Sequence, residues 1–151
     1  MTDEAPFRVG LRVEDVTGAA TFYAGLGFQQ AGSIAGPDGG PVMVILRRGG
    51  LQLLVDSLTG MPFPDSARER LTVAGPRGLG VVLGIQVEDV DATAEYCRSA
   101  GAAVTSGPLD APWGERYAEC LDPHGYAWKF YQPLPDAPPD GLNRAYDSWF
   151  A

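Results

Sequence analysis

The sequence has few of the residues that form disulfide frameworks, metal sites and membrane spans. Its 151 residues include two cysteines, Cys97 and Cys120, and a single histidine, His124. Two cysteines are too few for a disulfide framework, and their spacing excludes a CxxC site. We therefore expect both to be small core residues, Cys97 in a helix and Cys120 in a strand. No stretch approaches the roughly 18 apolar residues of a membrane span. The acidic start MTDEAPF does not resemble a signal peptide, and a cytoplasmic location is the default expectation.

Basic residues are also scarce. Eleven Lys and Arg residues stand against 19 Asp and Glu residues, which gives a formal net charge of −8. Binding to nucleic acid or to an anionic membrane requires a basic face, so we expect neither as a partner. The charge is compatible with a cationic partner, although an ordinary acidic surface explains it more simply.

Glycine and proline are abundant, with 20 and 13 residues, and 45% of the chain is hydrophobic. This composition favours a globular protein with many short strands joined by tight turns. The length allows one ordinary domain, residues 1–151, or two small modules that share a core.

Two segments of the chain are similar to each other. Residues 9–27 read VGLRVEDVTGAATFYAGLG and residues 83–101 read LGIQVEDVDATAEYCRSAG. An offset of about half the chain indicates a duplicated supersecondary unit. The identical pairs without a gap are Gly10/Gly84, Val13/Val87, Glu14/Glu88, Asp15/Asp89, Val16/Val90, Ala20/Ala94 and Gly27/Gly101.

The first module spans residues 7–57. The strand 7–13 alternates between two unlike faces, and a helix capped by Asp15 follows and stops at Gly27. Three strands are predicted after it, at 28–34, 43–47 and 51–56, with turns at 36–40 and 48–50.

The second module, residues 79–132, repeats this order. A strand at 81–88 precedes a helix that Asp89 caps and Gly101 ends. We predict a short strand at 103–106, a loop at 107–114, and strands at 115–121 and 126–131 around a type I turn at Asp122-Pro123-His124-Gly125.

Two segments fall outside the modules. Residues 58–78 are rich in turn formers and are interpreted as a linker, or as a mobile flap over a pocket through Met61 and Phe63. The tail, residues 133–151, begins with prolines and ends with aromatic residues. Exposed aromatic residues are costly in water, so we expect the tail to dock on the protein's own core, on a second subunit or over a ligand.

The two VEDV junctions, the duplication and the ending WGERYAECLDPHGYAWKFYQP together resemble the vicinal oxygen chelate superfamily, which contains glyoxalases, extradiol dioxygenases and bleomycin-resistance proteins. The resemblance covers residues 7–131. It implies an α+β fold in which two tandem βαβββ modules form curved mixed sheets around a cleft. It also implies a homodimer.

The resemblance further implies that metal-dependent members take their ligands from four strand positions, which here hold Arg8, Gln52, Val82 and Lys129. Arginine and lysine are cationic, valine has no donor atom, and only Gln52 could coordinate. Catalytic metals require several N, O or S ligands. His124 lies in a predicted turn, where a single histidine is usually solvated. We therefore expect neither a metal nor another cofactor.

Strand alternation predicts which side chains line the cleft. Small residues at Gly10, Gly84 and Ala127 leave room for a medium-sized organic ligand. Trp113 could stack on it or be a structural plug, and Arg116 could bind an anion or pair with a surface acid. Arg8 and Lys129 could instead pair with Glu88 or Asp56. The candidate ligand-binding residues are Arg8, Gln52, Leu54, Val82, Gln86, Trp113, Arg116, Lys129 and Tyr131.

Three functions are compatible with this pattern. The favoured one is a metal-free protein that sequesters an antibiotic or a related natural product, cationic or aromatic in character. The second is a metal-independent isomerase, cyclase or lyase, in which Lys129, Glu88 or Glu119 is the acid or base and Arg8 or Arg116 holds an anion. The third is a metal-dependent glyoxalase-like lyase or dioxygenase. No catalytic residue is assigned from the sequence.

Overall fold

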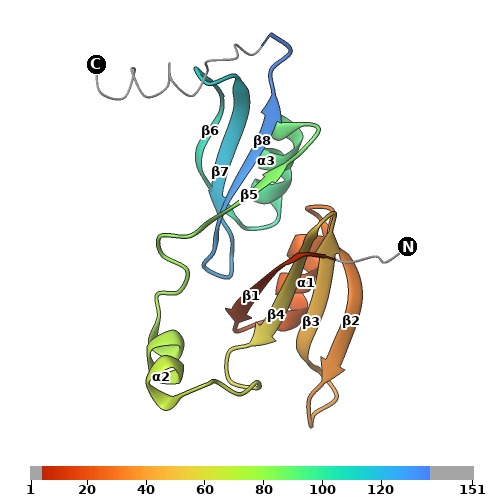
Figure 1. Cartoon of the computed structure of the whole chain (residues 1–151), viewed down its shortest axis with the longest axis vertical. Helices are drawn as coiled ribbons and strands as arrows, with labels where there is room; N and C mark the ends of the chain where they lie inside the picture. Colours follow the sequence, from red (N-terminus) through yellow and green to blue (C-terminus); the bar gives the residue numbers. More distant parts are fainter. Residues whose placement is uncertain (1–4, 137–151) are drawn as a thin grey trace. The chain divides into compact units, whose positions relative to one another are not determined.

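A computed structural model describes residues 5–136 of the chain (Figure 1). The described residues divide into two compact units, with the boundary between Arg77 and Gly78. Each unit contains one four-stranded sheet.

The first unit has the strand order β1-β4-β3-β2, in which β1 is parallel to β4 and the other neighbours are antiparallel. Its elements are β1 (Phe7–Val13), α1 (Val16–Ala24), β2 (Gln29–Ala35), β3 (Pro41–Arg48), β4 (Leu51–Ser57) and α2 (Ser66–Ala74).

The second unit repeats this topology with the order β5-β8-β7-β6, and β5 is parallel to β8. Its elements are β5 (Val82–Gln86), α3 (Val90–Ser99), β6 (Ala103–Ala111), β7 (Glu115–Leu121) and β8 (Ala127–Pro133). The predicted α+β fold with two βαβββ modules is therefore confirmed.

The residues shared by the two copies begin and end the helices. Asp15 and Asp89 are the N-caps of α1 and α3, and their side chains accept hydrogen bonds from the backbone N–H of Gly18 and Ala92. Gly27 and Gly101 have φ angles of 94° and 90°. A side chain is strained in this left-handed region, so glycine is required after each helix.

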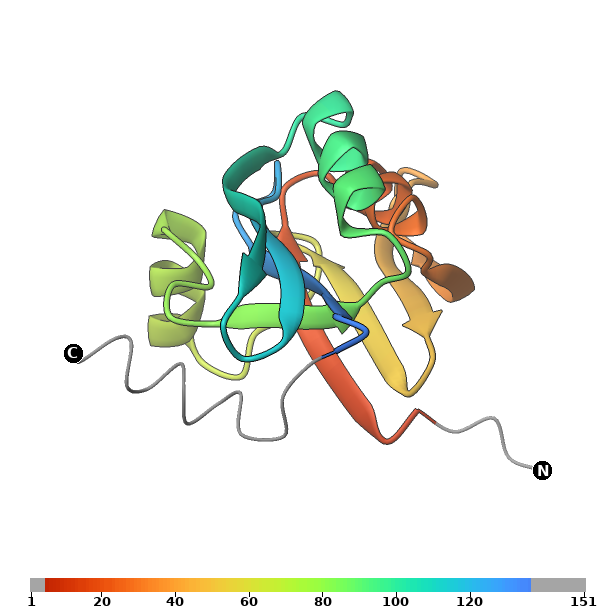
Figure 2. The same ribbon diagram turned by 90° about the horizontal axis from the view of Figure 1, so that it is seen from above.

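One face of each sheet is covered by a helix. Helix α1 packs on β3 and β4, and α3 packs on β6, β7 and β8, as Figure 2 shows from a second direction. The alternate residues of the strands that point to these helices are buried. They are Leu11, Val13, Val44, Leu46, Leu53 and Val55 in the first unit, and Ile85, Ala118, Cys120, Trp128 and Phe130 in the second.

Both cysteines are buried, as predicted, and both are free thiols. Cys97 lies on α3 and Cys120 on β7, and their Sγ atoms are 3.7 Å apart. The pair therefore contributes to the packing of α3 on its sheet.

Two predicted segments differ from the structure. Residues 58–78 contain the helix α2, which was missed because its residues are exposed and show no apolar stripe; Asp65 caps it by accepting from the Arg68 N–H. The predicted loop at 107–114 is strand as far as Ala111. The strand was not predicted because Pro108 argues against a regular strand. Proline is tolerated here, since β6 is an edge strand and its pairing with β7 is irregular between Ser106 and Leu109.

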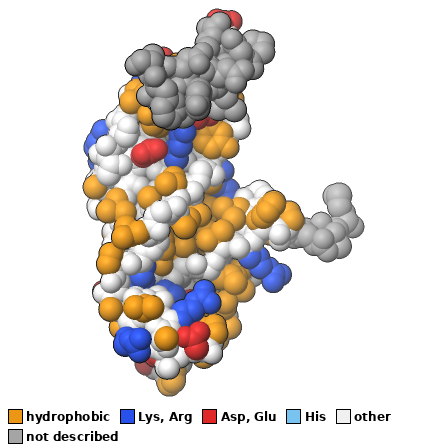
Figure 3. Space-filling view, turned by 60° about the vertical axis from the view of Figure 1, so that its left-hand side comes forward, with side chains coloured by type: hydrophobic (Ala, Val, Ile, Leu, Met, Phe, Trp, Pro, Cys, Tyr) orange, Lys and Arg blue, Asp and Glu red, His pale blue; other side chains and the backbone are white. Residues whose placement is uncertain are grey.

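The expected docking of the tail concerns residues 133–151, most of which lie outside the described residues. Within the described chain, no helix is both long and apolar enough to span a membrane. Figure 3 shows apolar side chains exposed on the surface, with Lys and Arg side chains beside some of them. Large exposed apolar residues include Phe7, Ile34, Leu71, Val82 and Leu121.

Candidate functional site

The face of the second sheet that lies opposite α3 carries most of the predicted ligand-binding residues. Val82 and Gln86 of β5 are in register with Ala127 and Tyr131 of β8, and Lys129 lies between them, opposite Gly84. A Cβ added at Gly84 would have Tyr131 Cε1 as its nearest neighbour, at 3.8 Å. Gly84 therefore leaves room for at least one further carbon atom beside Lys129.

Four side chains gather at one end of this face and form what we call the aromatic–lysine cluster: Trp113, Glu115, Tyr117 and Lys129. The rings of Trp113 and Tyr117 are stacked, with centroids 5.7 Å apart and planes inclined by 22°. The Lys129 Nζ lies 5.0 Å from the Trp113 ring centroid and 4.7 Å from that of Tyr117. Cation–π attraction operates at these distances.

Glu115 holds the cluster together. Its Oε1 accepts a hydrogen bond of 2.6 Å from the Trp113 indole N–H and lies 3.1 Å from Lys129 Nζ. The Glu115 and Lys129 side chains are 23% and 26% exposed. One carboxylate thus fixes both the indole and the ammonium, while each side chain remains accessible to a ligand.

Local structure explains why Trp113 lies here. It belongs to the turn between β6 and β7, in which the Gly114 N–H donates to the Ala111 carbonyl and the Leu134 N–H donates to the Gly114 carbonyl. Gly114 has a φ of 98°, which favours glycine. The turn places Trp113 over the side of the sheet that carries Tyr117 and Lys129.

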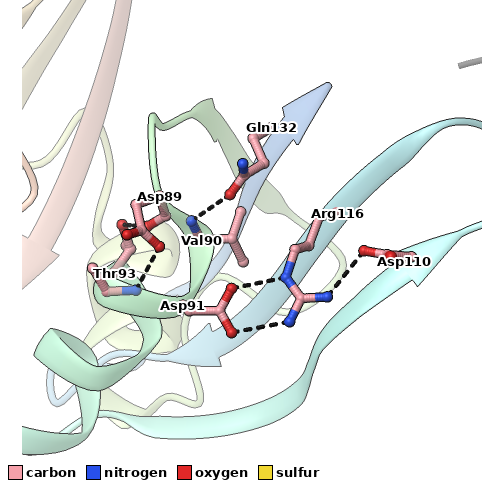
Figure 4. A network of polar contacts seen from close by, with 8 residues as sticks. Asp89, Val90, Asp91, Thr93, Asp110, Arg116 and Gln132 are labelled. Atoms are coloured by element: carbon pink, nitrogen blue, oxygen red, sulfur yellow. Dashed lines mark hydrogen bonds and ion pairs between the residues drawn. The ribbon is translucent and has the colours of Figure 1, made fainter. Parts of the chain in front are cut away.

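Among the predicted residues of the second unit, Arg116 lies on the other face of the sheet. It has the opposite parity to Glu115 and Tyr117 on β7, and it pairs with Asp91 of α3 and Asp110 of β6 (Figure 4). The hydrogen bonds from Arg116 lower the pKa of Asp91, and those to Asp91 and Asp110 raise the pKa of Arg116. Pairing with surface acids, the alternative considered for Arg116, is what the structure shows.

In the first unit, the predicted residues lie on the sheet face opposite α1. Arg8 is in register with Gln52, and Gly10 with Leu54. A Cβ built at Gly10 would meet nothing within 4 Å, so this part of the face is open. Arg8 is exposed, whereas Gln52 and Leu54 are half-buried.

Arg12, on the same face, fixes the segment that follows β4. Its guanidinium donates to the carbonyls of Ser57 and Met61, at 3.0 and 2.8 Å, and to that of Pro62. It also lies 3.8 Å from the centroid of the Phe63 ring. Met61 and Phe63, predicted to belong to a linker or mobile flap, are thus tied to β1.

The residues at the four metal-ligand positions do not suit a metal. Lys129 is cationic and is paired with Glu115, Arg8 is cationic, and Val82 offers no donor atom. Gln52 supplies a single neutral oxygen, whereas metal sites need several donors. Within residues 5–136, no group of three His, Cys, Asp or Glu side chains gathers closely enough to hold a metal ion.

Glu115 and Tyr117 were missed as site residues by sequence reasoning. The face of β7 on which Tyr117 lies could have been predicted from the sequence. Tyr117, Glu119 and Lys129 share a face once β7 and β8 pair around the predicted turn. The contacts of Trp113 could not be predicted from the sequence, since they depend on the conformation of the turn.

Comparison with known proteins agrees with this architecture. The sequence profile described as the Glyoxalase/Bleomycin resistance protein/Dioxygenase superfamily matches residues 6–130. The chain belongs to this superfamily. An uncharacterised protein of Mycolicibacterium smegmatis is 31% identical over 138 residues, which cover 89% of this chain and 98% of that protein.

Two solved structures of the superfamily fold are similar to the chain. TioX from Micromonospora sp. ML1 is 26% identical with a TM-score of 0.65, and the match covers 85% of this chain and 98% of TioX. TnmS3, an antibiotic binding protein from Streptomyces sp. CB03234, is 24% identical with a TM-score of 0.58, over 88% of this chain and 97% of TnmS3.

Proposed function

We propose that this superfamily member binds a small aromatic molecule without a metal, and that it sequesters an antibiotic or a related natural product. The aromatic–lysine cluster is the observation that carries the proposal. Indole and phenol rings are groups on which a planar ligand can stack, and aromatic pairs contribute about 0.5–1.5 kcal/mol beyond the area they bury. TnmS3 is an antibiotic binding protein with the same fold, and its role is consistent with this proposal.

The ion pair within the cluster favours binding over catalysis. Glu115 holds the Lys129 ammonium 3.1 Å away, and the ammonium also lies over two rings. Such a lysine can orient a ligand through its charge, but a general base must be deprotonated so that it can accept a proton from the substrate. The metal-independent enzyme remains the alternative, with Lys129 as the group to test.

A calorimetric titration with peptide, glycopeptide and quinone antibiotics tests the proposal. We expect at least one compound to bind more tightly than millimolar. Trp113→Ala and Lys129→Met should each weaken it at least tenfold, because one removes the stacking surface and the other the charge. The matched controls are Phe7→Ala, which truncates an aromatic ring that is 72% exposed, and Arg98→Met. Affinities that are equal in all variants would contradict the proposed site.

Metal analysis of protein purified without a chelator separates the binding protein from the metal-dependent lyase or dioxygenase. The donor chemistry of Arg8, Gln52, Val82 and Lys129 leads us to expect transition metal far below one equivalent per chain. One equivalent of a transition metal would overturn the proposed metal independence. The homodimer, the cytoplasmic location and the cleft between the two sheets remain predictions.

A further inference from the structure

The face of the first sheet opposite α1 has an ordered pattern of charge. Three residues on adjacent strands, Arg8 of β1, Gln52 of β4 and Arg47 of β3, are in register across the sheet. Directly opposed residues point to the same side of a sheet. We call Arg8, Gln52 and Arg47 the cationic row.

The spacing of the cationic row suits one anionic group. Strands two apart in a sheet are separated by about 10 Å, and long arginine side chains can converge from that distance. Gln52 stands between the two arginines and adds an amide N–H donor. Arg8 is exposed, Arg47 and Gln52 are half-buried, and within residues 5–136 Arg8 forms no ion pair.

An apolar floor borders the cationic row. The next row across the strands consists of Gly10, Leu54 and Ile45, in register with one another. Leu54 and Ile45 are half-buried, and the space above Gly10 is open. A flat apolar body can therefore rest on the floor while its polar group reaches the cationic row.

The row on the far side of the floor holds one acid beside one arginine. Asp56 lies in the following row, in register with Arg12 and Met43. Its Oδ1 is buried and has no hydrogen-bond partner. Burial raises the pKa of the Asp56 carboxyl, and the nearby Arg12 offsets only part of this rise. Arg12 of this row is already bound to backbone carbonyls, and Asp56 adds an acid beside it. An anionic group is therefore favoured two rows away, at the cationic row.

We propose that the cationic row is an anion subsite on the first unit and that the molecule bound there carries a carboxylate or a group of similar charge. The inference rests on the proposed small-molecule binding by this protein and names the charge of the group that this face binds. An anionic ligand differs from the cationic ligand that the acidic net charge allows. The local charge at a given row, rather than the net charge of the protein, decides which group is bound there.

Titrations with three naphthalene derivatives of similar shape test the subsite: 2-naphthoate, 2-naphthamide and 2-naphthylmethylamine. Binding is followed by amide chemical shifts in two-dimensional NMR spectra of the full chain. We expect 2-naphthoate to bind about tenfold more tightly than 2-naphthamide, since a charge-assisted hydrogen bond is stronger than a neutral one. The amine should bind most weakly at this face. The largest shifts with 2-naphthoate should be near Arg8, Gln52 and Arg47.

Variants assign the preference to particular residues. Arg8→Gln and Arg47→Gln should each remove most of the tenfold preference, and higher salt should reduce it in the wild type. Arg68→Gln, which removes an exposed charge on α2, and Asp56→Asn should keep the preference. Because Arg8 is exposed, we expect Arg8→Gln to fold normally, so that a lost preference reports on anion binding rather than on folding.

The two proposals fail differently. Equal affinities for 2-naphthoate and 2-naphthamide, or a preference that survives Arg8→Gln and Arg47→Gln together, would overturn the anion subsite while leaving aromatic binding intact. Failure of the small-molecule proposal shows as antibiotic titrations without binding in the wild type.

Discussion

Single residues determine whether the turns of this chain hold their strands together, and Asp122 is the clearest example. It is 4% exposed and joins β7 to β8. Its Oδ1 accepts from the backbone N–H of His124 and Tyr126 at 2.8 and 3.0 Å, and its Oδ2 accepts from the Trp128 indole at 2.9 Å. The turn was predicted from the sequence. The hydrogen bond from the Trp128 indole was not, because it depends on how Trp128 packs into the core.

Asp122→Ala should lower the free energy of unfolding by about 2–4 kcal/mol, because it leaves three donors without their acceptor. Asp122→Asn should cost less, since its single oxygen can still accept two of them. The control is Asp38→Ala, which removes an exposed turn bond to the Gly40 N–H and should change stability by about 0.5 kcal/mol or less. Urea unfolding measures all three, and a similar loss for Asp38→Ala and Asp122→Ala would contradict this role.

At the scale of the element, the sequence predicted the strands and helices that the duplication repeats. The strand boundaries 7–13 and 115–121 match the structure, since both strands alternate without a proline or a bulge. Helix α2 and the second half of β6 were missed because their local signals were weak or contradictory. A short exposed helix needs only a cap, and an edge strand tolerates Pro108.

The two equivalent helix caps allow a direct comparison. Asp15→Ala and Asp89→Ala should each lower the free energy of unfolding by about 1 kcal/mol, since each leaves a helix N–H without its acceptor. Glu95→Ala is the control, because its exposed pair with Arg98, at 3.5 Å, contributes little. Thermal or urea unfolding tests this, and no difference between the cap variants and the control would refute the assigned cap roles.

For the whole molecule, the sequence predicted the two-module fold, and it indicated Trp113 and Lys129 as candidates. Their contact with each other could not be predicted, since it depends on the β6–β7 turn and on the pairing of Lys129 with Glu115. Arg116 was grouped with them because it lies at the start of a strand after a loop and could pair with an anion. Its parity on β7 directs it to Asp91 and Asp110 instead. Parity along a strand is thus a better guide to the site than proximity along the chain.

The central claim is that the aromatic–lysine cluster binds a small molecule. Its most direct test is calorimetric titration of the tightest compound of the antibiotic panel into the wild type and into the double variant Trp113→Ala/Lys129→Met. We expect measurable binding to the wild type and a loss of at least tenfold in the double variant, with Phe7→Ala unchanged. Binding of equal strength to the double variant, or no binding tighter than millimolar by the wild type, would contradict it.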